Sequence, residues 1–554
     1  MPPQYRSATV RRDRHEVMAS RRGPPNVAHA KKVDGSVAAS MGWNSGQILN
    51  HEAAAAASWP PYAAPLGMPP MGSFSIPPAL PAQGMPAIPN ASVISSMQDR
   101  SAVAPFATLP RFATALTPAS MQQPMLLGAF SYDDQKNLCF DNRAKRHYHD
   151  PPVHADLNYG FEHFQDKPHI PDPLDSVLYT MMHRASAPYD DLGETVVGAS
   201  YVPADRVEME LLRTNVVTWR GILTKLCTAW SCHVQAPPTF REGFELNIMM
   251  VRSSLLGLTQ LGDTLIIEET PPTVYEIAAM HHAPPKPKRQ QKATYYGTQY
   301  MGHGLTKPGY SFEAYCTARG AEPAPVSTNE QWCHIVKTKL GSNRLVVGGE
   351  VDCVESLGEK ESVVELKTNM QLRDEQDQAR LDVKMLRMYM QSFLLGVRSI
   401  VIGFRDAQGM LLSHRAYRTA DLPRLVRGRP SQWSANDNLA FGAHILDFVR
   451  REIGAVMERW CLQVSESLRQ SEVYRGPYAW RVHRTTSSFL GHLPLPSVVD
   501  AEQEYPVFRL SFQPPFDQLT LRAVPPAELA LDGRRAYRCG LVPTAFYEWA
   551  TRPL

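Results

Sequence analysis

The chain has 554 residues, enough for more than one domain, and it carries 57 Lys and Arg against 54 Asp and Glu. This near balance excludes a globally basic nucleic-acid-binding protein, so any site for RNA, DNA or phosphate must be a local patch. The eight cysteines form no CxxC pair and no Cys/His zinc spacing, and no apolar run approaches the roughly 18 residues that span a bilayer, so we expect a soluble intracellular protein with reduced thiols and no membrane segment.

Residues 1 to about 122 are expected to form a disordered extension. The first 32 residues hold eight Lys and Arg against two acids. That composition suits a solvated tail, a nuclear signal, an organelle transit peptide or a nucleic-acid-binding arm. An Ala- and Pro-rich run follows at 53–90, with ten prolines between 60 and 89. Proline lacks a backbone donor, so this run predicts a linker of polyproline II type.

From about residue 126 to 525, strand and helix patterns mix and predict one large α/β domain, with mixed β-sheets flanked by helices. An insertion is expected at about 462–505, and a Pro-rich C-terminal tail at 526–554. The individual elements that we expect are a strand or turn feeding an apolar segment (216–230), two or three strands (244–270), Val-rich strands around Gly358, a helix (378–397), a buried strand (399–406), a helix (437–460) and a strand pair (508–522).

The stretch GGEVDCVESLGEKESVVELKTN, residues 348–369, places charged side chains in two strands that otherwise look buried. Side chains two apart on a strand share a face, so Glu350 and Asp352 point to one side of their strand, and Glu365 and Lys367 point to one side of theirs. An antiparallel hairpin turning at Gly358 would set Asp352 opposite Glu365, and Glu350 opposite Lys367. Like charges directly opposite each other destabilise a sheet, and buried carboxylates need a cation or a proton.

Two explanations fit this hairpin. The charges either lie on the solvated face of an edge hairpin, or a divalent cation lies between Asp352 and Glu365. Hard oxygen ligands suit Mg²⁺ or Mn²⁺, and Lys367 would then orient a water or stabilise phosphate charge. An acid, a gap and then acid-x-lysine is similar to the D-(D/E)-x-K active site of a broad nuclease fold. Glu313 lies before the hairpin, and Gln391 lies on the helix after it.

Taken together, the motifs resemble the decapping exoribonuclease family, the DXO/Rai-type proteins. The resemblance covers about 126–460 and 507–522, and it favours the catalytic explanation over the solvated hairpin. The matching pieces occur in family order: LGAFSYD (127–133), TWRGILTK (218–225), IIEETPP (266–272), GYSFE (309–313), GGEVDCV, VVELKT, MQSFLLGV (390–397), VIGFRD (401–406) and the FRLSFQ strand.

The resemblance implies a metal site and a nucleophile. Glu313, Asp352, Glu365 and the main-chain carbonyl of Leu366 would be ligands of Mg²⁺ or Mn²⁺. Glu350 would bind the metal through water or activate the nucleophile.

The resemblance also implies a substrate site. Lys367 and Gln391 would position the attacking water and the scissile phosphate, next to Glu313, and Arg220 would contact the RNA 5′ end. We further expect Lys384 and Arg387 to line the RNA groove, with a solvated helix face as the alternative.

The implied function is hydrolysis at RNA 5′ ends in 5′-end quality control. Family members remove incomplete or NAD-type caps or pyrophosphate, and some continue as 5′-to-3′ exoribonucleases. A restriction-type DNA nuclease and a non-catalytic scaffold for a partner 5′-to-3′ exonuclease are the alternatives; the intact carboxylates and lysine argue against a scaffold. We expect residence in the nucleus and also in the cytoplasm, with KPKR (286–289) either a nuclear signal or a solvated loop.

Overall fold

The computed structural model describes residues 104–110, 116–160, 163, 165, 167, 171–186, 200–201, 213–235, 243–251, 263–273, 310–318, 323, 326–358, 360–470, 505–530 and 538–551. All of them belong to one compact unit, Met71–Leu554. The basic start (1–32), the Pro-rich run (53–90) and the KPKR loop lie outside the described residues.

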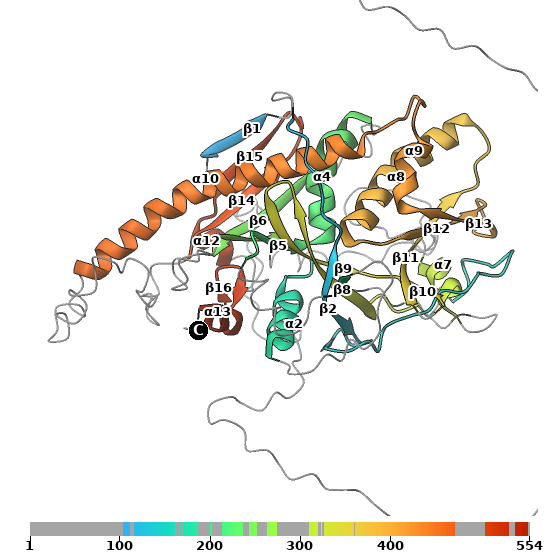
Figure 1. Ribbon diagram of the computed structural model, residues 1–554, viewed down its shortest axis with the longest axis horizontal. Coiled ribbons are helices and arrows are strands. Elements are labelled where there is room, and N and C mark those ends of the chain that lie inside the picture. The colour runs from blue at the N-terminus through green and yellow to red at the C-terminus, as the bar shows by residue number, and fades with distance from the viewer. Residues whose placement is uncertain are drawn as a thin grey trace, which may run out of the picture. The chain divides into compact units, whose positions relative to one another are not determined.

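An eleven-stranded mixed sheet forms the larger part of the fold (Figure 1). In spatial order its strands are β1 (Ala107–Pro110), β15 (Gln518–Ala523), β14 (Val507–Phe512), β6 (Phe244–Val251), β7 (Thr264–Glu269), β5 (Val216–Trp219), β9 (Asn343–Glu350), β8 (Gln331–Leu340), β2 (Met125–Tyr132) and β3 (Leu138–Cys139), with β4 (Ser200–Tyr201) paired to β2. β5 runs parallel to both of its neighbours, β7 and β9, and so ends at the same sheet edge as β9.

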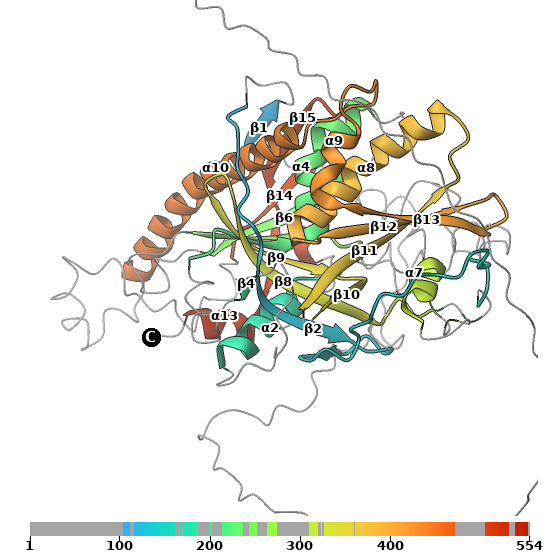
Figure 2. The same ribbon diagram turned by 45° about the vertical axis from the view of Figure 1, so that its right-hand side comes forward.

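A four-stranded sheet lies beside it, with the strands β10 (Cys353–Leu357), β11 (Lys360–Met370), β12 (Ser399–Arg405) and β13 (Leu411–Arg418) in that order. β11 and β12 are parallel, and helix α8 (Glu375–Leu395) makes the crossover between them. The side chain of Asp374 caps α8 by accepting a hydrogen bond from the N–H of Asp377, an interaction worth about 1 kcal/mol. In both ribbon views α8 lies on one side of this sheet and α7 (Tyr310–Thr317) on the other (Figures 1 and 2).

The remaining elements cover the large sheet or extend its edges. They are α2 (Asp175–Ser186), α4 (Arg220–Gln235), the 3-10 helix η4 (Thr419–Asp421), α9 (Leu422–Leu425), α10 (Ala435–Gln470), α12 (Pro526–Ala530), the paired strands β16 (Arg538–Cys539) and β17 (Val542–Pro543), and α13 (Thr544–Thr551).

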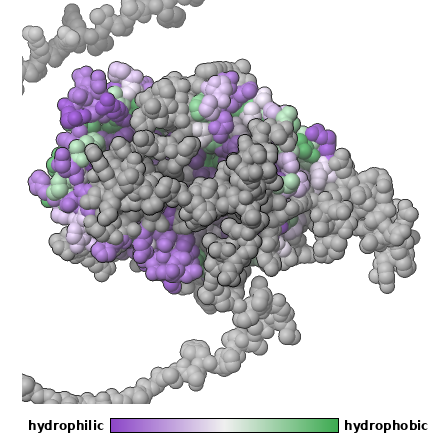
Figure 3. Space-filling model, turned by 180° about the vertical axis from the view of Figure 1, so that it is seen from behind, coloured by the Kyte–Doolittle hydropathy of each residue, from purple (hydrophilic) through white to green (hydrophobic). Residues whose placement is uncertain are grey.

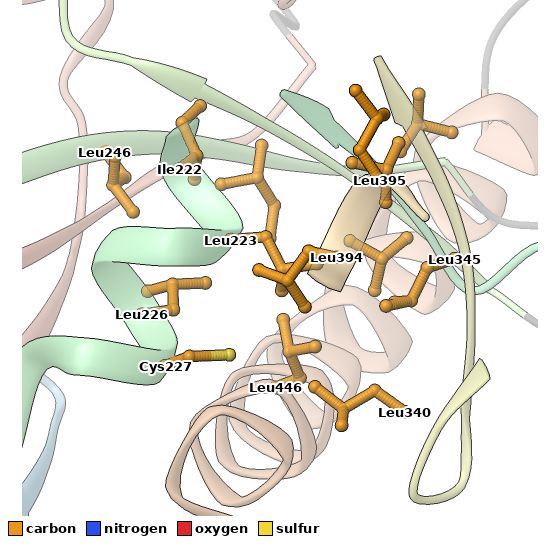
Figure 4. Close-up of a cluster of buried hydrophobic side chains, with 14 of the residues drawn as sticks. Ile222, Leu223, Leu226, Cys227, Leu246, Leu340, Leu345, Leu394, Leu395 and Leu446 are labelled. Atoms are coloured by element: carbon orange, nitrogen blue, oxygen red, sulfur yellow. The ribbon is translucent and has the colours of Figure 1, made fainter. Parts of the chain in front are cut away.

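The main core forms where α4, α8 and α10 meet the large sheet. Leu223 and Leu226 of α4 point toward Leu394 of α8 and Leu446 of α10 (Figure 4), and all four are buried. Each buried leucine contributes roughly 1.5–3 kcal/mol to the hydrophobic free energy of folding. This packing fixes the N-terminus of α4 and the C-terminal half of α8 relative to β9.

The small sheet has a different core on each face. Val364 and Leu366 of β11 belong to a small cluster with Phe312 of α7, whereas Ile400 and Ile402 of β12 belong to the main core. Residues directly across a ladder share a face, and the register pairs Glu365 with Ile400 and Lys367 with Ile402. The charged residues of β11 therefore lie on the α8 side of the sheet.

Most of the predicted elements are confirmed. The helix expected at 378–397 is α8, the buried strand is β12, the strand pair is β14 and β15, and the region 244–270 holds the two strands β6 and β7. The helix expected at 437–460 is α10, which continues to Gln470 and so enters the expected insertion.

The expected end of the N-terminal extension at 122 and the expected C-terminal tail at 526–554 are wrong. Residues 107–110, inside the expected disordered extension, form β1 on β15, and Leu109 is buried. The segment after 525 is part of the fold, because Leu541 and Val542 are buried in the main core and the N–H of Leu541 contacts Met249 Sδ on β6 at 3.3 Å. Its apolar residues cover the large sheet, although the flanking prolines suggest a tail.

No described helix is both long enough and apolar enough to cross a membrane. On the face seen in Figure 3, the described residues are mostly hydrophilic, and the hydrophobic ones form small, separate areas.

Candidate active site

Two glycines at the end of β9 let the surrounding helices approach closely. A Cβ atom on Gly348 would lie 2.6 Å from Val177 Cγ2 of α2, and one on Gly349 would lie 3.0 Å from Arg220 Cβ and 3.1 Å from Leu395 Cδ2. A side chain at either position would push α2, α4 or α8 away from the sheet. The GG of GGEVDC therefore brings the start of α4 and the end of α8 next to the charged hairpin.

The predicted opposition of Asp352 and Glu365 is present. Cys353 pairs with Val364 in the antiparallel β10–β11 ladder, and the next step places Asp352 across from Glu365. Asp352 Oδ2 accepts a hydrogen bond from the N–H of Leu366 at 2.7 Å. Burial, followed by the charge of Glu365, raises the pKa of Asp352 to about 7. The sequence argument therefore identified a real electrostatic conflict.

The predicted opposition of Glu350 and Lys367 is wrong. Glu350 ends β9 in the large sheet and pairs with Cys333, whereas Lys367 pairs with Ile402 in the small sheet. The chain changes sheets at 351–352, where the N–H of Val351 donates to the carbonyl of Trp332 at 2.8 Å. The single strand expected from LVVGGEVDCVE is thus two strands in two sheets.

Glu365 is held by two cations. Arg220 Nη1 lies 2.8 Å from Glu365 Oε2, and Lys367 Nζ lies 2.5 Å from Glu365 Oε1. Burial would raise the pKa of Glu365, but Arg220 and Lys367 together lower it below its ordinary value. Burial opposes the charged form of Lys367, yet Glu365, Asp352 and Glu313 raise its pKa well above the usual range. The lysine is therefore a fixed positive charge beside the carboxylates.

Glu313 approaches this cluster from α7. Burial raises the pKa of Glu313 well above its ordinary value, and the charges of Asp352 and Glu350 add to that effect, while Lys367 opposes it. Phe312, the preceding residue, is fully buried against β12 and fixes the helix there. The structure thus brings together Glu313, Glu350, Asp352, Glu365, Lys367 and Arg220, which were all predicted from sequence.

The carboxylates are of the type that binds a divalent cation, but their side chains are not arranged to coordinate one. Within the described residues, no three His, Cys, Asp or Glu side chains are close enough to hold an ion. Both oxygens of Glu365 are paired with cations, and the carbonyl of Leu366 accepts a hydrogen bond from Lys367 Nζ at 3.0 Å. However, the raised pKa values of Asp352 and Glu313 mean that this site favours added positive charge. The donor types fit Mg²⁺ or Mn²⁺, and binding would require side chains to rearrange.

The three predicted residues of α8 lie on one side of that helix. Lys384 Nζ donates to Asn369 Oδ1 of β11 at 2.9 Å. Asn369 shares a strand face with Lys367, so the side of α8 that carries Lys384, Arg387 and Gln391 is turned toward the row of charged residues on β11. Their contact with RNA stays a prediction.

A second group of cations near Glu350 was missed by the sequence analysis. Lys136 and Lys167 lie 3.5 and 3.2 Å from Asp172 Oδ2, and both hydrogen-bond Gln331. Burial lowers the pKa of Lys136 to about 8, although the charges of Asp172 and, less strongly, Glu350 oppose that shift. Burial also opposes the charged form of Lys167, but Asp172 and then Glu350 raise its pKa above the ordinary value.

These residues come from distant stretches that no spacing rule connects. The only available signal was that Lys136 lies three residues after the end of the LGAFSYD motif.

Comparison with known proteins places the chain among nucleases. A family model described as "RAI1 like PD-(D/E)XK nuclease" matches residues 122–491. A protein of Mycosarcoma maydis named decapping nuclease RAI1 is 32% identical over 502 residues, which cover 78% of this chain and 88% of that protein. A Xenopus laevis protein named decapping and exoribonuclease protein is 30% identical over 355 residues, or 59% of this chain and 77% of that protein.

Two solved structures share the fold. Scheffersomyces stipitis Rai1, in complex with (3′-NADP)⁺ and calcium ion, has a TM-score of 0.51 at 20% identity, over 80% of this chain and 99% of that one. Candida albicans Rai1, in complex with pU5-Mn²⁺, has a TM-score of 0.51 at 18% identity, over 80% of this chain and 98% of that one. The expected α/β fold with a nuclease-like core is confirmed.

Proposed function

The chain belongs to the RAI1-like PD-(D/E)XK nuclease family of hydrolytic enzymes, and from that premise we propose that it hydrolyses RNA 5′ ends at the cluster around Asp352 and Lys367. The observation that carries the proposal is the opposition of Asp352 and Glu365 beside a permanently charged lysine. The relatives named decapping nuclease and decapping and exoribonuclease protein support the choice of an RNA 5′ end. The proposed reactions are removal of GpppN or NAD caps, or of pyrophosphate from triphosphate RNA, with 5′-to-3′ exonuclease activity.

Glu313, Asp352, Glu365 and the carbonyl of Leu366 would hold a divalent cation, Mg²⁺ or Mn²⁺. When bound, the ion supplies Lewis-acid chemistry and offsets negative charge on the scissile phosphate. The Candida albicans structure with pU5-Mn²⁺ is consistent with this choice of ion. Asp352 and Glu365 are carboxylates with buried side chains opposite each other, and a cation between them would relieve their repulsion.

The side chains of this protein supply orientation and charge. Arg220 keeps Glu365 ionised and fixes its position. Lys367 can transfer its hydrogen bond from Glu365 to a non-bridging phosphate oxygen. Glu350 would orient the attacking water, and Gln391 would hold the phosphate. Water would then add to phosphorus and lose a proton to Glu350 or to solvent, the bond to the leaving oxygen would break, and that oxygen would take up a proton from solvent.

Lys136 and Lys167 extend the positive charge beyond the hydrolytic cluster. They lie beside Glu350 and are held by Asp172. We propose that they bind phosphates of the RNA 5′ end. Such contacts recognise the backbone and not the bases, so sequence preference should be weak.

An Asp352→Asn variant tests the proposal. Wild type, with Mg²⁺ or Mn²⁺, should release products from at least one of 5′-triphosphate, GpppN-capped, NAD-capped and 5′-monophosphate RNAs, whereas the variant should release none. The variant should be no less stable than wild type in urea, because it removes a charge that Glu365 repels. The conservative change of exposed Asp421, Asp421→Asn, is the matched control. Identical products from wild type and Asp352→Asn, or no products from wild type, would refute the catalytic assignment.

Residence in the nucleus and association with a 5′-to-3′ exonuclease remain proposals from the sequence. They rest on the family resemblance and on the basic segments, which lie outside the described residues.

A further inference from the structure

A second like-charge arrangement lies at the opposite end of the β8–β9 hairpin. Lys339 of β8 pairs directly with Arg344 of β9. Lys337, two residues before Lys339, shares its face, so three cationic side chains lie on one side of the sheet. Two like charges directly opposite each other destabilise a ladder. Arg344 is exposed and Lys339 is half-buried, so solvent reduces this repulsion, and an anion between the two side chains would relieve the rest.

These three residues line a cavity. Its volume is about 240 Å³, and it is lined by Gln122, Gln123, Met125, Thr214, Lys337, Thr338, Lys339, Arg344 and Leu345. All of these residues are in the described part of the chain, and none of them is a carboxylate.

Among the described residues, no carboxylate forms an ion pair with Lys339 or Arg344. Asp447 of α10 approaches the hairpin tip, but its Oδ1 accepts hydrogen bonds from Ser342 Oγ and Asn343 Nδ2 at 2.9 and 2.8 Å. The lining of the cavity therefore holds three cationic side chains and no carboxylate.

We propose that this cavity binds a phosphate group of the RNA chain, at a distance from the site of hydrolysis. The proposal rests on the proposed function for its ligand, since it assumes that the substrate is RNA. Arg344 and Glu350 are six residues apart on β9, which is about 20 Å at roughly 3.3 Å per residue. The face between them is covered, because Val346 is fully buried and α2 packs on Gly348, so an RNA would have to follow a longer path over α2. A single-stranded RNA with its 5′ end near Glu350 could reach the cavity with a later nucleotide.

The position in the sheet favours a phosphate over an acidic peptide. β8 and β9 are interior strands, flanked by β2 and β5, so their backbone groups are already paired. A peptide could not bind here by adding a strand, which requires a free edge. A phosphodiester needs only side-chain donors, and the cavity offers two basic residues directly across a ladder and a third beside them.

The test is a salt titration of RNA binding by the Lys339→Gln/Arg344→Gln double variant. Binding of 3′-fluorescein-labelled 5′-monophosphate RNAs of about five and about twenty nucleotides would be measured by anisotropy in EDTA, so that no hydrolysis occurs. Each phosphate that a single strand loses from the protein lowers the slope of log K against log salt by about 0.7. Because Lys339 and Arg344 would hold one phosphate, we expect the slope for the longer RNA to fall by about 0.7, with several-fold weaker binding, and the shorter RNA to bind as to wild type.

The matched control is Arg424→Gln/Arg427→Gln, which removes two exposed charges of the α9 region. The proposal is overturned if the double variant binds the longer RNA with the wild-type slope, or if the control lowers the slope equally. Two further arms use adenosine 5′-monophosphate and polyglutamate. If either ligand requires Lys339 and Arg344 while RNA length has no effect, the site serves a free nucleotide or an acidic protein, and the proposal is also overturned.

The two proposals can fail separately. Hydrolysis of the five-nucleotide RNA, measured with Mg²⁺ or Mn²⁺, should be unchanged in the double variant. If wild type hydrolyses no RNA but its binding slope depends on Lys339 and Arg344, the phosphate site stands and the proposed function falls.

Discussion

Replacement of Gly403 by alanine is expected to overpack the small core between β12 and α7. A Cβ atom there would lie 2.5 Å from Cε2 of Phe312 and 2.8 Å from both Cδ2 and Cζ. Carbon atoms pack best at about 3.5–4.0 Å, so the ring has to move by roughly 1 Å. Phe312 is fully buried, and it cannot move without shifting α7. Overpacking of this kind costs about 1–3 kcal/mol in the free energy of unfolding.

Urea unfolding of single and double variants measures this cost. In a Phe312→Leu background the ring is absent, so Gly403→Ala should cost at least about 1 kcal/mol less than in wild type. Gly454→Ala is the control, because nothing lies within 4 Å of the added Cβ on helix α10. That change should be neutral or stabilise by up to about 1 kcal/mol. The reasoning is refuted if Gly403→Ala unfolds at the wild-type urea concentration, or if its cost is the same in both backgrounds.

Three other outcomes follow from the described contacts. Glu528→Ala should cost about 3–5 kcal/mol in urea unfolding, because it leaves the cations of Arg509 and Arg522 without their shared carboxylate; a loss below about 1 kcal/mol would show that the interaction is unimportant. Burial, followed by the charge of Lys145, lowers the pKa of His334 to about 3. Between about pH 6.5 and 3 the unfolded chain therefore binds a proton that the folded chain does not. The free energy of unfolding should decrease as the pH is lowered through this range, by up to about 1.4 kcal/mol per pH unit. His334→Gln should reduce that slope, and an unchanged slope would contradict the assignment. Burial lowers the pKa of Lys136 to about 8, so affinity for 5′-phosphate RNA in EDTA should weaken as the pH rises from about 7 to 9. Lys136→Arg should stay charged and show a weaker dependence of affinity on pH. If wild type and variant show the same dependence, Lys136 does not bind phosphate.

The sequence predicts the carboxylate cluster well because its geometry is local. The β10–β11 register follows from a short turn at Gly358, so the opposition of Asp352 and Glu365 can be worked out by counting residues. Arg220 and Glu313 could be placed only through the family resemblance, since their positions depend on how α4 and α7 pack on the sheets.

The rest depends on long-range pairing that counting residues cannot supply. Nothing in LVVGGEVDCVE shows that the chain leaves one sheet after Glu350 and enters another at Cys353. Lys136 and Lys167 meet Asp172 only after β2 and β8 have paired, which requires the whole central part of the chain. Counting residues also cannot show that β1 pairs with β15, or that the segment 538–551 packs on β6.

Because the chain changes sheets after Glu350, the site is complete only when the two sheets are packed together. Glu350 belongs to the eleven-stranded sheet, whereas Glu365 and Lys367 belong to the four-stranded sheet. If the four-stranded sheet opened as a separate cooperative unit, the larger sheet could stay folded while Glu365 and Lys367 moved away from Glu350. Activity would then disappear before global unfolding, and hydrogen exchange of the β10–β13 amides, not the melting of the whole protein, would track the fraction of competent molecules.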